Sequence, residues 1–203
     1  HPATWTKLLS AYLHDAMEQG VERIFVDVLD QPMYVNTFCN VGFQTYSRQT
    51  IWRLFAPPLE SVAFQGNTII RPATPADEWA ISQLYVRTTP ELVQQAEGAP
   101  SAQECRSPIL SSWLAQHGVT YILIDRGDVT GAVQVATGRH GAWLQWWTDP
   151  LQTDLRNVKQ LVAHGLTVIL ENHWRTPIYM AVADYQSGSN RLLMDLGFAP
   201  YSD

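Results

Sequence analysis

Cysteine is scarce in this sequence, which holds only Cys39 and Cys105 among 203 residues. Two cysteines are too few for the disulfide framework of a small secreted domain or for a four-cysteine zinc site. The six histidines show no metal-binding spacing, so we expect no metal. Free thiols fit a reducing compartment, and the chain does not open on the charged and apolar segments of a signal peptide. We therefore expect a cytoplasmic protein.

Basic charge and long apolar runs are also lacking. Lysine and arginine number 13 against 19 aspartate and glutamate, for a net charge of −6, and no basic block offers a surface for a phosphate backbone. The longest apolar stretches, such as residues 119–124, are far too short to cross a bilayer. We expect neither nucleic acid nor membrane as a partner. Hydrophobic residues, at 46%, suffice for a sizeable core.

The first 56 residues alternate helix and strand patterns. Residues 7–19 place apolar side chains on one helical face, and Gly20 follows as a helix stop. Residues 23–29 then predict a buried strand, residues 33–41 a short helix, and residues 43–55 a second strand. Two prolines end that strand, because proline lacks the N–H that a sheet ladder needs.

The second block opens with a strand and a helix that begins at a capping box, where Thr74 is followed three residues later by Asp77. A meander of three strands joined by glycine-containing turns comes next, followed by a long helix, a strand and a short helix. The elements expected, in order, are a strand at 67–71, strands at 119–124, 129–137 and 142–148, a helix at 154–173 and a strand at 178–183.

The end of the second block repeats the first block. Both run helix, strand, short helix and Gly-Phe, and residues 41–47 and 196–202 share Gly-Phe followed by Tyr-Ser. This order predicts an internal duplication. We expect three segments, with a half-unit at 1–56, a linker at 57–67 and a fuller unit at 68–203. The fold class expected is α/β, a mixed twisted sheet with helices on both faces.

The second block resembles the GNAT N-acyltransferase superfamily, and residues 1–55 resemble the second half of the same fold. The chain thus resembles a tandem, degenerate GNAT protein with one partial and one nearly complete unit. The resemblance rests on four motifs, which are residues 70–77, Trp147-Thr148-Asp149-Pro150, residues 192–198 and, in the first block, residues 40–43.

The resemblance implies an activity. It implies an N-acetyltransferase that takes acetyl-CoA or another acyl-CoA as co-substrate and acylates a small-molecule amine or a peptide N-terminus. In that family acyl-CoA lies where two neighbouring parallel strands splay apart, and a glycine-rich loop holds its diphosphate.

Several family features are missing. The loop at 151–158 has no glycine, and Asp154 puts a negative charge where phosphates would lie. The family's tyrosine acid, four residues before the Gly of Gly-Phe, is replaced by Phe38 and Leu193. Its asparagine after the strand corresponds to Gln31 and Gln186. A second function therefore stays open, that of a non-catalytic ligand-binding or protein-interaction module.

Candidate site residues follow from the same alignment with the family. For acyl-CoA they are Trp146, Trp147, Thr148, Arg156 and Asn157. The tryptophans equally fit a core covered on two faces, since Trp143 and Trp147 would face one side of the strand and Trp146 the other.

The acid–base chemistry has several candidates. Asp149 is a candidate general base, or else an aspartate that forms the turn before a proline. Candidates to replace the missing tyrosine acid are Tyr34, Tyr179 and Tyr185. Glu91, Glu97 and Glu104 predict a solvated segment over the site, where the acceptor would be selected.

The half-unit also bears on partners. It leaves a sheet edge unpaired, and such an edge favours pairing with a second copy of the chain or with missing chain. We therefore expect a homodimer as one outcome.

Overall fold

A computed structural model of the chain describes residues 2–56, 68–98, 109, 117–149, 151, 153–174 and 176–201. These residues form two units, His1–Arg48 and Gln49–Asp203. The linker expected at 57–67 lies outside the described residues. The two units are taken in turn below.

The first unit contains two helices, α1 (Pro2–Glu18) and α2 (Pro32–Cys39). Both confirm helices predicted from the sequence, and each is followed by a glycine with positive φ, +75° at Gly20 and +102° at Gly42. Only glycine adopts such angles without strain, so these two residues end the helices. After α1 the N–H of Val21 donates to the carbonyl of Ala16 at 3.0 Å.

The strand expected at 23–29 is not formed in the described structure, and that prediction was wrong for this chain. The segment is extended, but no ladder joins it to another described segment. Its apolar side chains stay open to solvent, with Phe25 53% and Leu29 55% exposed. A lone extended segment has nothing to satisfy its backbone groups, so a strand pattern without a neighbour does not make a sheet.

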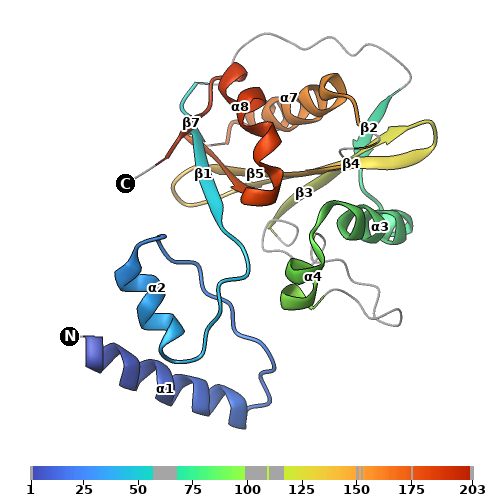
Figure 1. The fold of residues 1–203 in the computed structure, drawn as a ribbon. Coiled ribbons are helices and arrows are strands. Elements are labelled where there is room, and N and C mark those ends of the chain that lie inside the picture. Colours follow the sequence, from blue (N-terminus) through green and yellow to red (C-terminus); the bar gives the residue numbers. More distant parts are fainter. Residues whose placement is uncertain are drawn as a thin grey trace. The chain divides into compact units, whose positions relative to one another are not determined.

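The second unit is built on one seven-stranded mixed sheet (Figure 1), which confirms the expected fold class. The strand order is β2-β3-β4-β5-β6-β1-β7, with β5 and β6 parallel and the other neighbours antiparallel. The strands are β1 (Gln49–Leu54), β2 (Ile69–Pro72), β3 (Gly118–Asp125), β4 (Asp128–Thr137), β5 (Ala142–Thr148), β6 (Ile178–Ala183) and β7 (Ala199–Pro200).

Strand β1 comes from the early part of the chain and lies between the two last strands. It pairs antiparallel with β6 from Gln49↔Ala183 to Leu54↔Ile178, and its other edge pairs with β7. The sequence predicted a strand over 43–55, of which only 49–54 forms. The strand is fixed in place because Trp52 and Leu54, both 3% exposed, bury alternate positions in the core.

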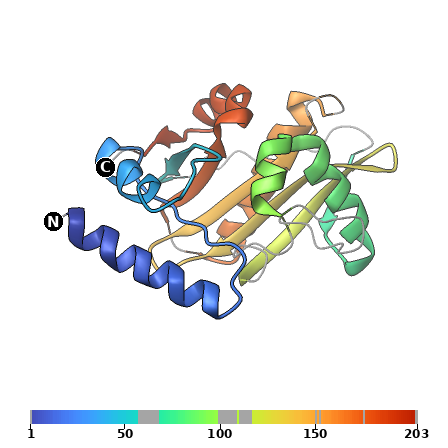
Figure 2. The ribbon, with the colours of Figure 1, turned by 60° about the horizontal axis from the view of Figure 1, so that its bottom comes forward.

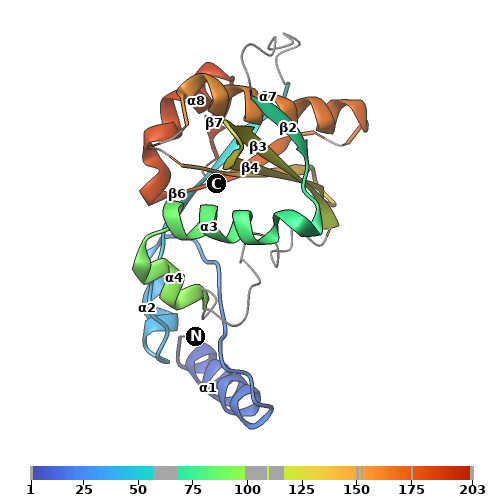
Figure 3. The same cartoon turned by 90° about the vertical axis from the view of Figure 1, so that its right-hand side faces the viewer.

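Helices cover both faces of this sheet, as expected (Figures 1 and 3). On one face lie α7 (Leu155–Glu171) and α8 (Asn190–Asp195), and on the other lie α3 (Glu78–Thr88) and α4 (Glu91–Glu97). Figure 2 shows α3 and α4, in green, in front of the yellow strands β3 and β4. The short helices η1 (Pro75–Asp77) and η2 (Asp184–Ser189) precede α3 and α8. None of the described helices combines the length and the apolarity needed to cross a membrane.

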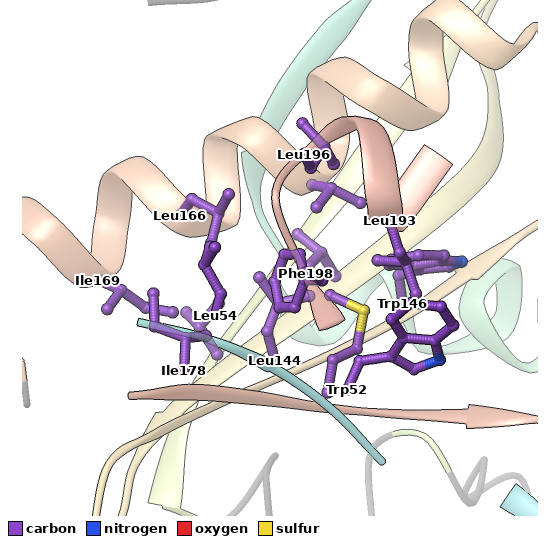
Figure 4. Packing of buried hydrophobic residues seen from close by; sticks show 14 of the residues in the cluster. Trp52, Leu54, Leu144, Trp146, Leu166, Ile169, Ile178, Leu193, Leu196 and Phe198 are labelled. Carbon is purple, nitrogen blue, oxygen red and sulfur yellow. The ribbon is translucent and has the colours of Figure 1, made fainter. Parts of the chain in front are cut away.

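Two hydrophobic clusters fill the layers on either side of the sheet. The larger lies under α7 and α8 and contains Trp52, Leu54, Leu144 and Trp146 (Figure 4). The smaller lies under α3 and contains Trp147. The two adjacent tryptophans thus belong to opposite faces, which confirms the alternation predicted along this strand.

The capping box before α3 forms as predicted and ties the helix to β2. Asp77 Oδ2 accepts hydrogen bonds from the backbone N–H and hydroxyl of Thr74, at 2.8 and 2.7 Å. Arg71 from β2 donates to both carboxylate oxygens, at 2.8 and 2.7 Å. This guanidinium holds the pKa of the Asp77 carboxyl well below its usual range. The residues 70–77 therefore form a rigid entry to the fold.

Candidate functional site

The two parallel strands β5 and β6 pair over only part of their length. Three pairs join them, Ala142↔Ile178, Trp143↔Tyr179 and Leu144↔Met180. Beyond these, residues 145–148 pair with β4 alone and residues 181–183 pair with β1 alone. We call these two segments the parted strands. Each presents a row of backbone groups that the other strand does not satisfy, and such groups require another partner.

The side chain of Gln186 bridges the parted strands. Its Nε2 donates to the carbonyl oxygen of Trp146 at 3.3 Å, and its Oε1 accepts from the N–H of Ala183 at 3.4 Å. Both distances are longer than the usual 2.9–3.0 Å or so of an N–H···O bond, so both bonds are weak. Gln186 stands where the family resemblance has asparagine, and it is a replaceable partner for these backbone groups.

The amino end of α7 follows directly after β5. Asp154 is the N-cap of this helix, and its Oδ1 accepts from the N–H of Arg156 at 3.1 Å. A helix N-terminus attracts anions because its first N–H groups lack partners. Here a carboxylate already bonds to one of those groups and adds a negative charge of its own.

The five candidates for acyl-CoA binding gather at one end of the sheet. Trp146, Trp147 and Thr148 lie on the parted segment of β5, and Arg156 and Asn157 lie on the first turn of α7. Both tryptophan side chains are core residues, 4% and 6% exposed, so they support the strand from its two faces. Thr148 and Asn157 are half-buried and Arg156 is exposed. Contact of these residues with acyl-CoA stays a prediction.

Asp149 is buried, 3% exposed, and both of its carboxylate oxygens are bonded. Oδ2 lies 3.1 Å from Nε of Arg87 on α3, and Oδ1 accepts from the N–H of Leu151 at 3.0 Å. The second bond is an Asx turn, the loop-forming role that the sequence also allowed. Arg87 further donates to the carbonyl of Val129 at 3.1 Å, so the pair locks α3 to the end of β5. A general-base role for Asp149 stays a prediction.

A carboxylate–tyrosine pair lies on the α3 side of the sheet, and the sequence did not predict it. The hydroxyl of Tyr85 on α3 donates to Glu97 Oε2 on α4 at 2.5 Å. Burial raises the pKa of the Glu97 carboxyl, and the bond from Tyr85 lowers it by a smaller amount. Tyr85 belongs to the same hydrophobic cluster as Trp147, so its side chain lies on the same side of the sheet as Trp147.

The segment of three glutamates thus has different environments. Glu91 is exposed as predicted, Glu97 is half-buried against the prediction of a solvated segment, and Glu104 lies outside the described residues. Nothing in the sequence around Glu97 marks it, because its partner is fixed by the packing of α4 on α3.

The three tyrosines named as replacement acids belong to three different elements. Tyr34 is on α2 in the first unit, Tyr179 is on the paired part of β6, and Tyr185 follows β6 with 36% exposure. The position of the family's tyrosine acid in the second unit, Leu193, is fully buried in the core. Within the described residues no three histidine, cysteine, aspartate or glutamate side chains gather into a metal site.

Comparison with known proteins finds similarity in structure alone. No protein-family model matches the sequence, and no curated protein matches it either. A GCN5-related N-acetyltransferase from Sphaerobacter thermophilus superposes with a TM-score of 0.56 at 12% identity, covering 84% of this chain and 54% of that one. A putative GNAT-family acetyltransferase from Novosphingobium aromaticivorans gives 0.51 at 13% identity, covering 76% and 61%.

A third solved structure matches over nearly the whole chain. It is a conserved protein of unknown function from Staphylococcus epidermidis, with a TM-score of 0.62 at 8% identity, covering 99% of this chain and 77% of that one. The chain spans 54% and 61% of the length of the two acetyltransferases. At these identities the likeness establishes the fold. This protein has the GNAT acetyltransferase fold, and its function has to be argued from its own residues.

Proposed function

We propose that the chain is an N-acetyltransferase that moves an acetyl group from acetyl-CoA to the amine of a small molecule or a peptide N-terminus. The observation that carries the proposal is the parting of the parallel strands β5 and β6 inside a GNAT fold. Two rows of backbone groups facing one another give an extended, amide-containing ligand a partner on each side. Other acyl-CoAs share this amide-containing part, so the same argument applies to them.

The residues of this chain act mainly by positioning. Bound acyl-CoA supplies a thioester, whose carbon–sulfur bond breaks as the amine nitrogen bonds to the acyl carbon and the thiol leaves with a proton. Once Gln186 gives way, the backbone groups of residues 145–148 and 181–183 would form hydrogen bonds with the amide-containing arm of acyl-CoA. Arg156 and Asn157, on the first turn of α7, would meet the phosphates. Proximity alone lowers the barrier of such a reaction by several kcal/mol, up to roughly 10.

We assign the general base to Glu97 rather than to Asp149. An amine attacks only when neutral, so a base has to accept a proton from it directly or through a water. Both oxygens of Asp149 are bonded and its charge is paired with Arg87. Glu97 accepts a hydrogen bond from the neutral hydroxyl of Tyr85, and burial raises its pKa toward the working range of a base.

The pH profile of acetyl transfer is expected to report this assignment. The carboxylate of Glu97 is the active form, so kcat/KM should rise with pH through a pKa above that of an ordinary glutamate. In Tyr85→Phe the bond that lowers this pKa is lost, and the acid limb of the profile should move to higher pH. Glu97→Gln should remove the limb and lower kcat by about a hundredfold, in the usual range for losing a general base.

Glu91→Gln serves as the matched control for these profiles, since Glu91 is an exposed residue of the same helix. Its profile should equal that of the wild type. An acid limb that stays in place in Tyr85→Phe and in Glu97→Gln would assign the base elsewhere, with Asp149→Asn as the next variant to measure.

Calorimetric titration with acetyl-CoA tests the function itself. Asp154→Asn removes the charge that faces the diphosphate but keeps an equally good N-cap, so helix α7 should be unaffected. If phosphates lie at this helix end, removal of about 1 kcal/mol of repulsion should tighten binding about fivefold at low salt. The gain should shrink as salt is added.

Asp195→Asn, on α8, is the control with the same change of charge. Absence of binding and of thermal stabilisation at millimolar acetyl-CoA, in both wild type and Asp154→Asn, would refute the proposal. Binding that is equal in all three proteins would keep the co-substrate and move its phosphates away from α7.

A second function has support from two contacts. Gln186 occupies the backbone groups of the parted strands, and Asp154 occupies the end of α7. Both favour a non-catalytic module that keeps the fold and binds a ligand or another chain. Such a module would bind acetyl-CoA weakly in every variant above and transfer no acetyl group, so the titrations together with the acetyl-transfer assay separate the two functions.

A homodimer stays a proposal of its own. The extended segment 23–29 is rich in apolar residues and has no described strand beside it, which suits pairing with a second copy. Light scattering at several concentrations distinguishes a dimer from a monomer.

A further inference from the structure

A pocket of about 360 Å³ opens on the second unit, next to the paired ends of β5 and β6. It is lined by Ile51, Gly138, Arg139, His140, Trp143, Tyr179 and Tyr201. None of these residues belongs to the parted strands or to α7. The volume is at the lower end of the range for small-molecule sites, which suits a ligand with a single or fused ring.

Aromatic rings form the wall of this pocket. Trp143 and Tyr179 stack with ring centroids 5.2 Å apart and planes inclined by 29°. Tyr201 meets Tyr179 edge to face at 5.7 Å. All three side chains are half-buried, so each has one surface packed and another open to the pocket. Rings held in this way offer a ligand ring both stacked and edge contacts.

The rim of the pocket is cationic, although the chain as a whole carries a net charge of −6. Arg139 and His140 line it from the β4–β5 turn and are exposed. The guanidinium of Arg53 lies 4.3 Å from the centre of the Tyr201 ring. Among the described residues no carboxylate lies within ion-pair distance of Arg53 or Arg139. The rim therefore complements an anionic group on an aromatic ligand.

The pocket lies close to the point where the strands part. Trp143 and Tyr179 form the second of the three residue pairs that join β5 and β6, and Leu144↔Met180 is the third and last. Side chains two positions along a strand share a face, so Gln145 and Ala181, at the start of the parting, follow on the same side about 7 Å away. An amino group three bonds from a ring in the pocket would extend from the ring toward this point.

We propose that this pocket binds an aromatic amino acid, with its ring against Trp143 and Tyr179 and its carboxylate at Arg139. If the proposed function holds, this amino acid is the acceptor of the acetyl group. Its nitrogen then bonds to the acyl carbon as the thioester bond breaks, and its proton leaves through Glu97. The carboxylate excludes simple arylalkylamines as good ligands, and the ring excludes aliphatic amino acids.

Calorimetric titration of the whole chain with four probes tests the pocket without acyl-CoA. L-phenylalanine and L-tryptophan should bind. Phenethylamine, which lacks the carboxylate, and cyclohexylalanine, which lacks the aromatic ring, should bind about tenfold more weakly. Arg139→Gln should weaken L-phenylalanine about fivefold and leave phenethylamine unchanged, because an exposed charge contact is worth at most about 1 kcal/mol. Arg191→Gln, on α8, is the control and should bind like the wild type.

Tyr179→Leu should weaken the binding of L-phenylalanine about tenfold. If that variant fails to fold, Arg139→Gln still tests the pocket, because Arg139 is exposed and its replacement should not affect folding. Two results would overturn the proposed ligand of this pocket. One is equal binding of L-phenylalanine and cyclohexylalanine, and the other is an Arg139→Gln variant that binds L-phenylalanine as tightly as the wild type. Binding of L-phenylalanine with these dependences but without acetylation would refute the transferase alone. Acetylation of other amines without L-phenylalanine binding would refute the pocket alone.

Discussion

A chain that begins at Thr68 is expected not to fold, although it contains the whole block, 68–203, that resembles a nearly complete GNAT unit. It lacks β1, the strand that joins β6 to β7. Without β1 one edge of β6 loses six residue pairs, and β7 loses its neighbour in the sheet. The buried partners of Trp52 and Leu54 would face water.

The size of this effect follows from the two side chains alone. Loss of a buried tryptophan costs about 3–5 kcal/mol and loss of a buried leucine about 2–5 kcal/mol. Together they match much of the roughly 5–15 kcal/mol that stabilises a whole domain. The lost ladder adds to this, so the shortened chain should lie below the threshold of stable folding.

A chain that begins at Gln49 is the matched comparison. It keeps β1 and removes only the first unit, so it should fold with a cooperative thermal transition and with the far-ultraviolet circular dichroism of a mixed α/β protein. The chain that begins at Thr68 should show neither. A cooperative transition at the same temperature in both chains would contradict the role given to β1.

Replacement of Arg87 by methionine is expected to cost about 3–5 kcal/mol of unfolding free energy, because it leaves the buried Asp149 carboxylate without its cation. The side chain of Asp149 is only 4% exposed, whereas that of Arg87 is 39% exposed. The pair is therefore asymmetric. Asp149→Asn leaves a charge that water can reach and keeps an acceptor for the N–H of Leu151, so it should cost less, about 1–2 kcal/mol.

Urea unfolding of the two single variants and the double variant measures this asymmetry. The double variant should be more stable than Arg87→Met, because it no longer buries a lone charge. Arg191→Met, an exposed arginine outside any described ion pair, should change stability by less than about 0.5 kcal/mol. Equal costs for Arg87→Met and Asp149→Asn would contradict the argument from burial.

Features set by neighbouring residues were predictable from the sequence. The helix over 7–19 follows from its apolar face and Gly20, and the capping box follows from Thr74 and Asp77. The meander was predictable because alternation and glycine turns are local signals. The opposite faces of Trp146 and Trp147 follow from the strand period alone.

Features set by distant partners were not predictable. The pattern at 23–29 matches that of β6, yet only β6 has strands on both sides. The pairing of β1 with β6, the contact of Tyr85 with Glu97, and the meeting of Trp143 with Tyr179 all depend on packing between separate elements. The parting of the strands was expected from the family resemblance and not from any residue in them.

The place of β1 in the sheet also governs how the chain can fold during synthesis. The ribosome releases residues 49–54 early, but their partner β6 is complete only when residue 183 has left the exit tunnel. Throughout that interval Trp52 and Leu54 have no core to enter, and the nascent chain carries an apolar strand in need of a chaperone. Closure of the sheet is thus a late event as the chain emerges, and strand β7 can dock only after β1 has found its place.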